Sequence, residues 1–568
     1  MLSLRHCSKS ARYTLRPRPL ATLNRVYIRP VGYRLLSTST SEDYDVVIIG
    51  GGPAGLALAA GLGTNVITSR LKIALVEASG LDKVRNWTEA AGQYSNRVSS
   101  LTNESVAFIH STGAWEYVDT RRACPLEAMQ VWDGISDARI HFSPSDLARL
   151  PTTGTIPGSM AMMTENLNLQ QGLLRKLESV PNVKLLDTTK VEGIQSGPGD
   201  YNSWPVVNTS TGKSLRSRLL IGADGFNSPV RKFAGIESSG WAYDTHAVVA
   251  TLFHSHREKY ATLAHLEQPN STAFQRFLTT GPIACLPLSP TASSLVWSTT
   301  PAIASALKAS SPATLAIFVN AAFRLPNSAL QNLYSVLLAS HQKETPLSPE
   351  VARAEVQQAE IAHSIKPHDA RASADIDSLT KGVLPEGSNL LPPLVIGIQD
   401  KSVAGFPLKY SHAETYIGTG QGARTVLVGD AAHTVHPLAG QGLNMGSYTA
   451  LLPYMRARYM HNQSLLLATD SLHKLYGTTA PPIVWARSTG LEIINELSTI
   501  KGALMGVAGA SPGNASTSWW HAAASGLEGL AGAGDVLRAV GGSLKDTLTK
   551  TGSSLIQGGV NALKNSGR

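Results

Sequence analysis

The sequence predicts an α/β fold in which a nucleotide-binding domain is interleaved with a second domain built on a mostly antiparallel sheet. Two observations lead to this prediction. Three segments rich in glycine and aspartate, at 50–55, 222–225 and 429–433, each follow an apolar run typical of a buried strand. Between the second and third segments, residues 247–299 form a series of short strand-like runs. The chain is therefore expected to leave the first domain and return to it.

The first segment lies between a predicted strand, Asp45–Ile49, and a predicted helix that opens with Leu56–Leu62. A G-x-G-x-x-G pattern needs this setting to bind a dinucleotide. Gly50 makes the tight turn, Gly52 lets the backbone approach a pyrophosphate, and Gly55 allows the helix to pack closely on the strand. The phosphates would lie at the positive N-terminus of the helix.

A second predicted strand, Lys72–Glu77, ends in an acidic residue at about the sequence distance expected for a ribose contact. A carboxylate at this strand end can accept hydrogen bonds from the ribose hydroxyls. The alternative is an ordinary surface carboxylate. Because the strand belongs to the dinucleotide unit, we expect Glu77 to bind the ribose.

The second segment is a predicted strand, 219–222, that runs into an Asp224-Gly225 turn. An isolated Asp-Gly pair usually marks only a turn. Here the apolar strand before it and the run Ser228-Pro-Val-Arg231 after it make the pattern more specific. We therefore expect Asp224 and Gly225 to contact the same cofactor.

The third segment is the most informative of the three. A predicted strand delivers Asp430 to a sugar hydroxyl, and the loop through Pro437 to Gly442 brings backbone N–H groups close to a planar ring before a helix starts at about Leu443. A helix N-terminus directed at a flavin pyrimidine would stabilise the negative charge of the reduced ring. Together the segments indicate FAD held at three points in a Rossmann-like FAD-binding domain.

Most of the net charge of +9 lies in residues 1–41, which contain eight Lys or Arg and no Asp or Glu. Subtracting these eight from 49 leaves 41 basic residues against 40 acidic ones, so the charge gives no support for nucleic-acid binding. An N-terminus rich in Arg, Ser and Thr and free of acids is typical of a mitochondrial transit peptide. A basic disordered tail is the alternative.

Three cysteines, one of them in the predicted presequence, are too few for a disulfide framework or a metal cluster and suit a reducing compartment. The longest apolar stretch, 46–62, contains the glycine loop, so we predict no membrane span. Apolar residues at helical spacing from Leu491 to Leu504 predict an amphipathic helix, which either packs on the core or lies on a membrane surface.

A chain of 568 residues is long enough for two or three domains. Residues 301–390 have a helical pattern and then become rich in Pro and Ser, which indicates an insertion or a domain cap. The predicted parts are a transit peptide at 1–41, an FAD-binding domain at 42–120, 161–235 and 401–510 (the last with C-terminal helices), a substrate domain at 121–160 and 236–400, and a low-complexity tail at 511–568.

The chain resembles the aromatic-ring flavoprotein monooxygenases of the p-hydroxybenzoate hydroxylase type, and among them the ubiquinone-biosynthesis hydroxylases of the UbiH/Coq6 family. The resemblance covers about 43–300 and 390–500. Relatives often carry an arginine where this chain has Val403 and Ala404, which changes the polarity of one wall of the site. Besides the three segments, the resemblance rests on Ser95–Ser99, Met129–Gly134, Gln275–Ala284 and Gly405–Leu408.

The resemblance implies FAD as cofactor, with Arg97 near its phosphates or ribose and Gln170 in a helix that lines the flavin. It implies transfer of one oxygen atom of O2 to the ring of a polyprenylated 4-hydroxybenzoate-type intermediate of ubiquinone synthesis, at C5, between the strand at Phe274–Phe277 and the loop at Phe406-Pro407. The candidate cofactor-binding residues are Gly50, Gly52, Gly55, Glu77, Arg97, Gln170, Asp224, Gly225, Asp430, Pro437, Gly440, Gln441, Gly442, Leu443 and Asn444.

The resemblance also implies electrons from a ferredoxin and its reductase, membership of a multi-protein coenzyme Q synthesis complex, and a peripheral position on the matrix face of the mitochondrial inner membrane. No side-chain base is evident. His433 and His436 are candidates, although histidines in such a loop more often support its fold.

Three other functions stay open at this point. They are hydroxylation of another aromatic substrate, reduction of isoprenoid chains, and non-catalytic escort of prenylated partners by a protein with the same fold. An escort protein would be expected to lose the flavin-facing loop, whereas Gly440, Gly442 and Asn444 are present.

Overall fold

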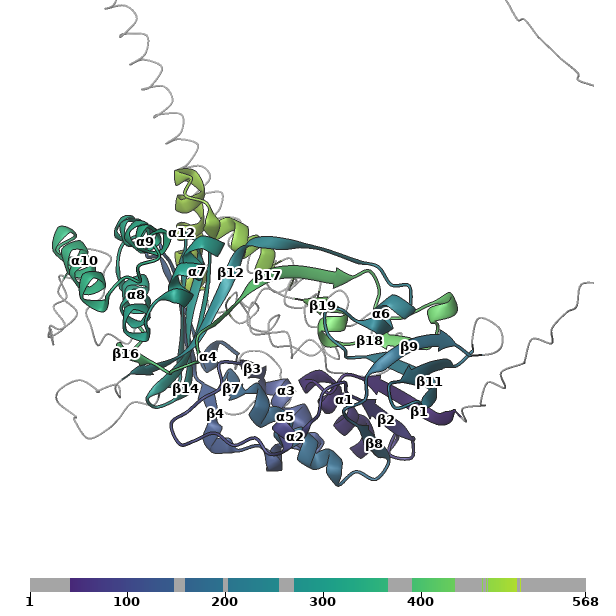
Figure 1. Ribbon diagram of the computed structural model, residues 1–568. Coiled ribbons are helices and arrows are strands. Elements are labelled where there is room, and N and C mark those ends of the chain that lie inside the picture. The colour runs from purple at the N-terminus through teal and green to yellow at the C-terminus, as the bar shows by residue number, and fades with distance from the viewer. Residues whose placement is uncertain are drawn as a thin grey trace, which may run out of the picture. The chain divides into compact units, whose positions relative to one another are not determined.

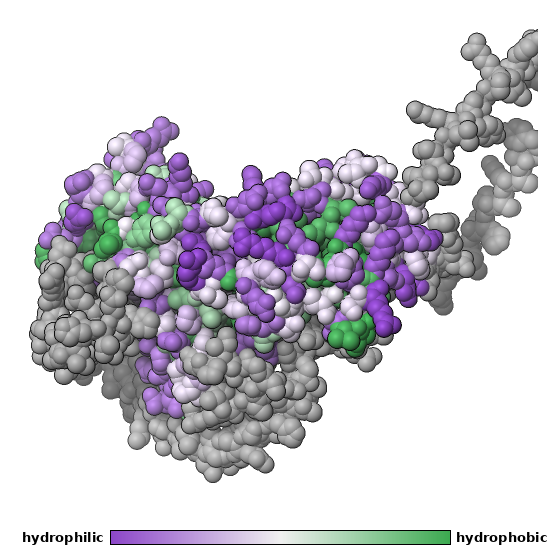
Figure 2. Space-filling model, turned by 90° about the horizontal axis from the view of Figure 1, so that it is seen from below, coloured by the Kyte–Doolittle hydropathy of each residue, from purple (hydrophilic) through white to green (hydrophobic). Residues whose placement is uncertain are grey.

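Three sheets organise the part of the chain that the computed structural model describes. The predicted transit peptide, low-complexity tail and flavin-facing loop lie outside that part. None of the described helices is long and apolar enough to cross a membrane. The face seen in Figure 2 is mainly hydrophilic, with apolar residues in separate groups, as expected of a face in contact with water. The described residues are 41–147, 159–197, 203–254, 270–365, 391–434 and 468–497, with the single positions 462, 466 and 501.

The seven-stranded sheet forms the predicted nucleotide-binding domain (Figure 1). Val47, Ile48 and Leu75 in its parallel strands are fully buried, and the helices α1 (Pro53–Thr64) and α5 (Asn166–Glu178) share their core. The strand order is β8-β2-β1-β11-β10-β9, with β18 paired to β11; the bounds are β1 Glu42–Ile49, β2 Ile73–Val76, β8 Val183–Leu186, β9 Val191–Ser196, β10 Pro205–Thr209, β11 Ser214–Gly222 and β18 Thr425–Leu427.

The nine-stranded sheet forms most of the second domain. Its strands pair antiparallel except for β13 with β5, and the 17-residue strand β12 pairs with β15, β16 and β17. The order is β19-β17-β12-β15-β14-β13-β5-β6, with β16 paired to β12; the bounds are β5 Ala128–Asp133, β6 Arg139–Phe142, β12 Ser238–His254, β13 Thr272–Leu278, β14 Gly281–Ser289, β15 Ala292–Thr299, β16 Val395–Ile398, β17 Ala404–Ala413 and β19 His433–Thr434.

The chain visits these two sheets in turn. It builds β1 and β2 in the first sheet, β5 and β6 in the second, β8 to β11 in the first, β12 to β17 in the second, β18 in the first and β19 in the second. The prediction of two interleaved domains is confirmed. A three-stranded sheet, β3-β7-β4, packs Leu126 and Ala161 against Ala273 of the second sheet; its bounds are β3 Val98–Thr102, β4 Ala123–Leu126 and β7 Ala161–Glu165.

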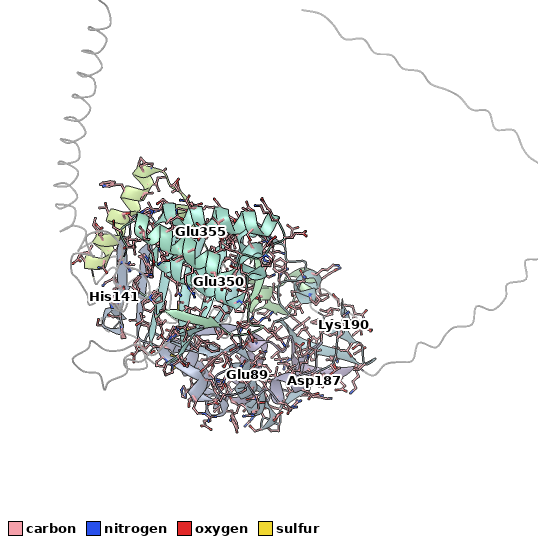
Figure 3. All side chains as sticks on the ribbon, turned by 60° about the vertical axis from the view of Figure 1, so that its left-hand side comes forward. Glu89, His141, Asp187, Lys190, Glu350 and Glu355 are labelled. Carbon is pink, nitrogen blue, oxygen red and sulfur yellow. The ribbon has the colours of Figure 1, made fainter. Side chains whose placement is uncertain are left out.

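Four helices between residues 301 and 362 cover one face of the nine-stranded sheet. Trp132, Phe274 and Trp297 of the sheet are buried in one cluster with them, so these helices are part of the domain core. The helical pattern predicted from residue 301 is thus seen at 301–362, while the Pro- and Ser-rich part at 366–390 lies outside the described residues. Glu350 and Glu355 mark the last helix in Figure 3. The helices are α7 Pro301–Ala309, α8 Pro312–Arg324, α9 Asn327–Gln342 and α10 Pro349–Ala362.

The opposite face of this sheet contacts the C-terminal helices. Side chains of a strand alternate between faces, so Phe274 packs with α7 to α10 while Phe277 stacks on Tyr476 with ring centroids 4.1 Å apart. Of the two aromatic residues on the strand expected to line the substrate site, Phe274 therefore faces the helical layer and Phe277 the opposite side. Helix α12 (Pro481–Glu496) lies on the same face as Phe277, beside His141 of β6 (Figure 3).

A buried ion pair anchors α12. The guanidinium of Arg487 donates two hydrogen bonds to the Asp133 carboxylate, at 2.9 and 3.0 Å, and both side chains are at most 1% exposed. It also donates to the carbonyls of Leu475 and Thr478. Burial of two ions carries a desolvation penalty in free energy. The hydrogen bonds between the two charges and to the carbonyls offset this penalty.

We predict that Arg487→Met destabilises the protein by about 3–5 kcal/mol, since it leaves the Asp133 carboxylate buried without its counter-ion. Thermal unfolding should occur several degrees lower than in the wild type. Arg121→Met is the matched control, because Arg121 pairs with Asp119 at 2.9 Å but is 88% exposed. Exposed pairs of this kind contribute little to stability, because water and salt screen the charges. Equal effects of the two substitutions would contradict the anchoring role of Arg487.

Candidate cofactor site

The three sequence segments meet at one edge of the seven-stranded sheet. The register places Gly222 beside both Ile49 and Leu427, and all three strands run parallel. The N–H of Ala223 donates to the Ile49 carbonyl at 2.8 Å, and the N–H of Val428 donates to the Gly222 carbonyl at 2.9 Å. The segments therefore emerge together at the carboxyl ends of the strands (Figure 1), where open α/β sheets bind ligands.

The three pattern glycines have different surroundings. Gly50 has a φ of +113°, and a Cβ there would lie 2.2 Å from the Ala223 carbonyl oxygen. A Cβ on Gly55 would lie 1.9 Å from the Gly50 carbonyl oxygen, so the fold itself needs both glycines. Gly52 differs, because its φ is an ordinary −71° and a Cβ there would meet no described atom within 4 Å. The space beside Gly52 fits the close approach of a phosphate to the backbone.

The start of helix α1 adds to this fit. The helix has no side-chain cap and no acidic residue in its first turn, so its first N–H groups are available to an anion. Glu77 and Gln170 flank the turn. The Glu77 carboxylate accepts from the N–H groups of Gly51 (2.6 Å) and Ser79 (2.8 Å), and the Gln170 amide donates to the Gly51 carbonyl at 3.4 Å.

Asp224 has one oxygen that the described protein leaves unpaired. Its Oδ2 accepts from the N–H of Val230 at 3.1 Å, while Oδ1 is buried and has no hydrogen-bond partner among the described residues. Burial raises the pKa of this carboxyl. An unpaired buried oxygen is rare in folded proteins and indicates a missing partner such as a ligand hydroxyl.

Asp430 lies against the start of α1. The preceding residue, Gly429, is so close that a Cβ there would lie 3.3 Å from the Cβ of Ala54. The Asp430 carboxylate is solvent-accessible and forms no hydrogen bond or ion pair within the described ranges, yet the protein around it desolvates it enough to raise its pKa. Asp430 is thus reachable from solvent and also has protein close around it, as expected of a residue in the wall of a ligand site.

Arg231 joins the second segment to the third. Its guanidinium donates to the carbonyl of Ala431 at 2.7 Å and to the carbonyl of Phe226 at 2.6 Å. The side chain of Ser228 caps the short helix that carries Arg231, α6 (Pro229–Phe233). The motif after Asp224 therefore holds the main chain next to Asp430, a role that the sequence pattern does not reveal.

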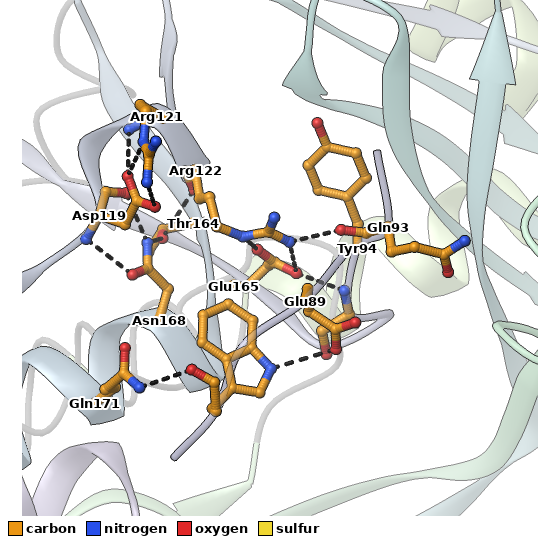
Figure 4. A network of polar contacts seen from close by, with 12 residues as sticks. Glu89, Gln93, Tyr94, Asp119, Arg121, Arg122, Thr164, Glu165, Asn168 and Gln171 are labelled. Atoms are coloured by element: carbon orange, nitrogen blue, oxygen red, sulfur yellow. Dashed lines mark hydrogen bonds and ion pairs between the residues drawn. The ribbon is translucent and has the colours of Figure 1, made fainter. Parts of the chain in front are cut away.

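Arg97 lies on a loop that precedes β3. Its side chain is exposed, and its carbonyl accepts from the N–H of Asn166 at 3.0 Å. Two residues earlier, the N–H of Ser95 donates to Glu165, which forms a 2.6 Å ion pair with Arg122 (Figure 4). The Glu165 side chain is 1% exposed. Sequence analysis missed this pair, because an Arg-Arg dipeptide and a glutamate before a helix both resemble ordinary surface residues.

The two histidines considered as bases have different outcomes. His433 is buried on β19 and faces His412 of β17 in the register. Nε2 of His412 lies 2.8 Å from the Tyr416 hydroxyl, and burial lowers the pKa of His412 to about 4, so it is uncharged near neutral pH. His433 lies below the surface, with its ring centre 5.8 Å from that of Tyr416. His436 and the candidates Pro437, Gly440, Gln441, Gly442, Leu443 and Asn444 lie outside the described residues.

These observations fit FAD. The space at Gly52 and the free start of α1 suit a pyrophosphate, and the unpaired oxygen of Asp224 and the accessible carboxylate of Asp430 suit sugar hydroxyls. Within the described ranges no group of His, Cys, Asp and Glu could hold a metal ion.

Comparison with known proteins agrees with this fit. Residues 43–309 match the family of FAD binding domains. Three curated relatives carry the name ubiquinone biosynthesis monooxygenase COQ6, mitochondrial. The protein of Schizosaccharomyces pombe is 35% identical over 81% of this chain and 90% of its own length. That of Saccharomyces cerevisiae is 34% identical over 85% and 97%, and that of Homo sapiens is 35% identical over 84% and 94%.

A solved structure supports the fold. The p-nitrophenol 4-monooxygenase PnpA of Pseudomonas putida DLL-E4 superposes with a TM-score of 0.51 over 83% of this chain and 99% of its own, at 14% identity. Taken with the relatives, the chain belongs to the COQ6 family of ubiquinone biosynthesis monooxygenases and is a flavoprotein monooxygenase with FAD as its cofactor.

Proposed function

We propose that this enzyme hydroxylates the aromatic ring of a polyprenylated 4-hydroxybenzoate-type intermediate of ubiquinone synthesis, at C5. The observation that carries the proposal is the convergence of three flavin-type segments at one sheet edge, in a chain that matches COQ6 relatives over more than four-fifths of its length. The relatives' names support an oxygenase and disfavour a non-catalytic escort protein.

The proposed roles of the site residues follow from their positions. Gly52 and the start of α1 would hold the pyrophosphate, Glu77 a ribose, and Asp430 a hydroxyl of the ribityl chain. The candidates from Pro437 to Asn444 would face the flavin ring. Bound FAD supplies the electrons that activate O2. The protein would orient the substrate ring and exclude water from it.

The substrate ring is proposed to lie near Phe406 and Pro407 of β17. Phe406 is 45% exposed, where β17 pairs with β12 alone. An isoprenoid tail would contribute binding free energy by apolar burial, at about 25 cal/mol per Å2. The tail would then anchor the molecule, while a few contacts align the small ring.

The electron source is proposed to be a ferredoxin and its reductase, with the enzyme working inside a multi-protein coenzyme Q synthesis complex. This rests on the family resemblance alone. Turnover of the purified enzyme that requires the ferredoxin pair would support it, and full turnover with NADPH alone would refute it.

The proposed location is the matrix face of the mitochondrial inner membrane. The acid-free, basic first 41 residues and the mitochondrial names of the relatives support import. A peripheral contact with the membrane is supported by exposed apolar side chains in the C-terminal helices: Leu472, Leu475, Ile483, Trp485, Ile493 and Leu497.

We predict that cells lacking this protein make no ubiquinone and accumulate a prenylated phenol without the C5 hydroxyl. Mass spectrometry of lipid extracts measures both. Asp430→Asn should fail to restore ubiquinone, whereas Asp43→Asn should restore it, because Asp43 pairs with Arg216 at the amino ends of the strands. Normal ubiquinone in the deletion strain would show that another aromatic compound is the substrate.

We predict that deletion of residues 2–41 leaves the protein in the cytosol. The truncated enzyme should still bind FAD in vitro, because strand β1 starts at Glu42, after the deleted segment. Fluorescence microscopy of a C-terminal fusion and the flavin absorbance of the purified protein measure the two effects. Unchanged import of the truncated chain would refute the transit peptide.

A further inference from the structure

A glutamine side chain joins the second domain to the loop that carries Arg97. The amide oxygen of Gln399 accepts from the N–H of Tyr94 at 2.8 Å, and its amide nitrogen donates to the carbonyl of Tyr94, also at 2.8 Å. Gln399 is 8% exposed. The Gln399 side chain thus satisfies both the N–H and the carbonyl of Tyr94, as the backbone of a neighbouring β-strand would.

On the side of the FAD-binding domain, Tyr94 begins the loop that carries Arg97. Two residues of the FAD-binding side also hold this loop. The N–H of Ser95 donates to the buried Glu165, and Arg122 donates to the carbonyl of Gln93 at 2.7 Å (Figure 4). The guanidinium of Arg122 also lies 4.9 Å from the centre of the Tyr94 ring. The loop is therefore fixed between the Arg122–Glu165 pair and Gln399.

On the side of the second domain, Gln399 belongs to the turn that leads into β17. Its N–H donates to the carbonyl of Thr251 on β12 at 2.9 Å, and its carbonyl accepts from the Ser402 hydroxyl at 2.7 Å. The carbonyl of Ser402 in turn accepts from the amide of Asn96 at 2.6 Å. Strand β17 starts two residues later and carries Phe406.

We propose that Gln399 is a positioning residue that couples the cofactor loop at Arg97 to the strand at Phe406. Ordering of the Arg97 loop by FAD would be transmitted through the Gln399 amide to the start of β17. The inference rests on the proposed function at Phe406 and on the contact of Arg97 with FAD that the family resemblance implies. Coupling of this kind is reciprocal, so a molecule bound at Phe406 would also tighten the hold on FAD.

The test is hydrogen–deuterium exchange of the full chain with and without FAD, followed by mass spectrometry. In the wild type, FAD should slow amide exchange both at 93–97 and at 404–408, the latter by about fivefold or more. Gln399→Met keeps the length and burial of the side chain but removes both hydrogen bonds. It should retain the FAD-dependent protection at 95–97 and lose that at 404–408, while the Tyr94 amide, which loses its acceptor, exchanges faster with or without FAD.

Gln171→Met is the matched control. Gln171 is a buried glutamine of the FAD-binding domain whose amide donates to the carbonyls of Val84, Arg85 and Trp87, away from β17. This variant should behave like the wild type at 404–408. If it also loses that protection, the effect reflects general loosening and the proposal is wrong.

Two further results would overturn the inference. FAD-dependent protection at 404–408 that survives in Gln399→Met would show that the signal reaches β17 by another route, for which the Asn96–Ser402 hydrogen bond is the candidate. Its absence in a wild-type protein that binds FAD would show that the two segments are not coupled. Failure of the wild type to bind FAD is a distinct result, because it removes the proposed function and this inference with it.

Discussion

The cofactor site depends on the parallel register that sets Ile49, Gly222 and Leu427 level with one another. Backbone hydrogen bonds between these strands fix where each of the three segments leaves the sheet. The close contacts of Gly50 with Ala223 and of Gly429 with Ala54 follow from that placement. Segments from distant parts of the sequence can therefore contribute to one binding site without any of them being long.

Buried polar contacts, and not apolar packing alone, fix the elements around the two domains. The Gln399 amide joins the second domain to the loop before β3, the Arg122–Glu165 pair holds that loop, and the Asp133–Arg487 pair holds α12 on the nine-stranded sheet. Such contacts are specific in direction, because a buried polar group without its partner costs free energy. Directional contacts of this kind can hold a loop at one defined position. Apolar contacts are not directional and fix a position less well.

Much of this could be predicted from the sequence, because the strand–glycine–helix pattern is local. The interleaved fold, the segments that meet at the sheet edge and the helical layer after residue 301 all follow from such patterns. The face on which Phe274 lies could not be predicted, because alternation along a strand does not say which face is which. Gln399, Glu165 and Arg231 depend on partners far away in the sequence, so no local pattern marks them. The roles of the residues from Pro437 to Asn444 stay predictions.

The central claim is that the sheet edge binds FAD through backbone approach at Gly52, a position where the fold itself does not require glycine. The most direct measurement is FAD titration of Gly52→Ala apoprotein by flavin fluorescence, together with its unfolding temperature. Gly193→Ala in β9 is the control, because a Cβ there also meets no described atom. The account predicts a loss of about 10- to 100-fold in FAD affinity, roughly 1.4–2.8 kcal/mol, with nearly unchanged stability for Gly52→Ala and no loss for the control. Wild-type FAD affinity in Gly52→Ala would contradict it.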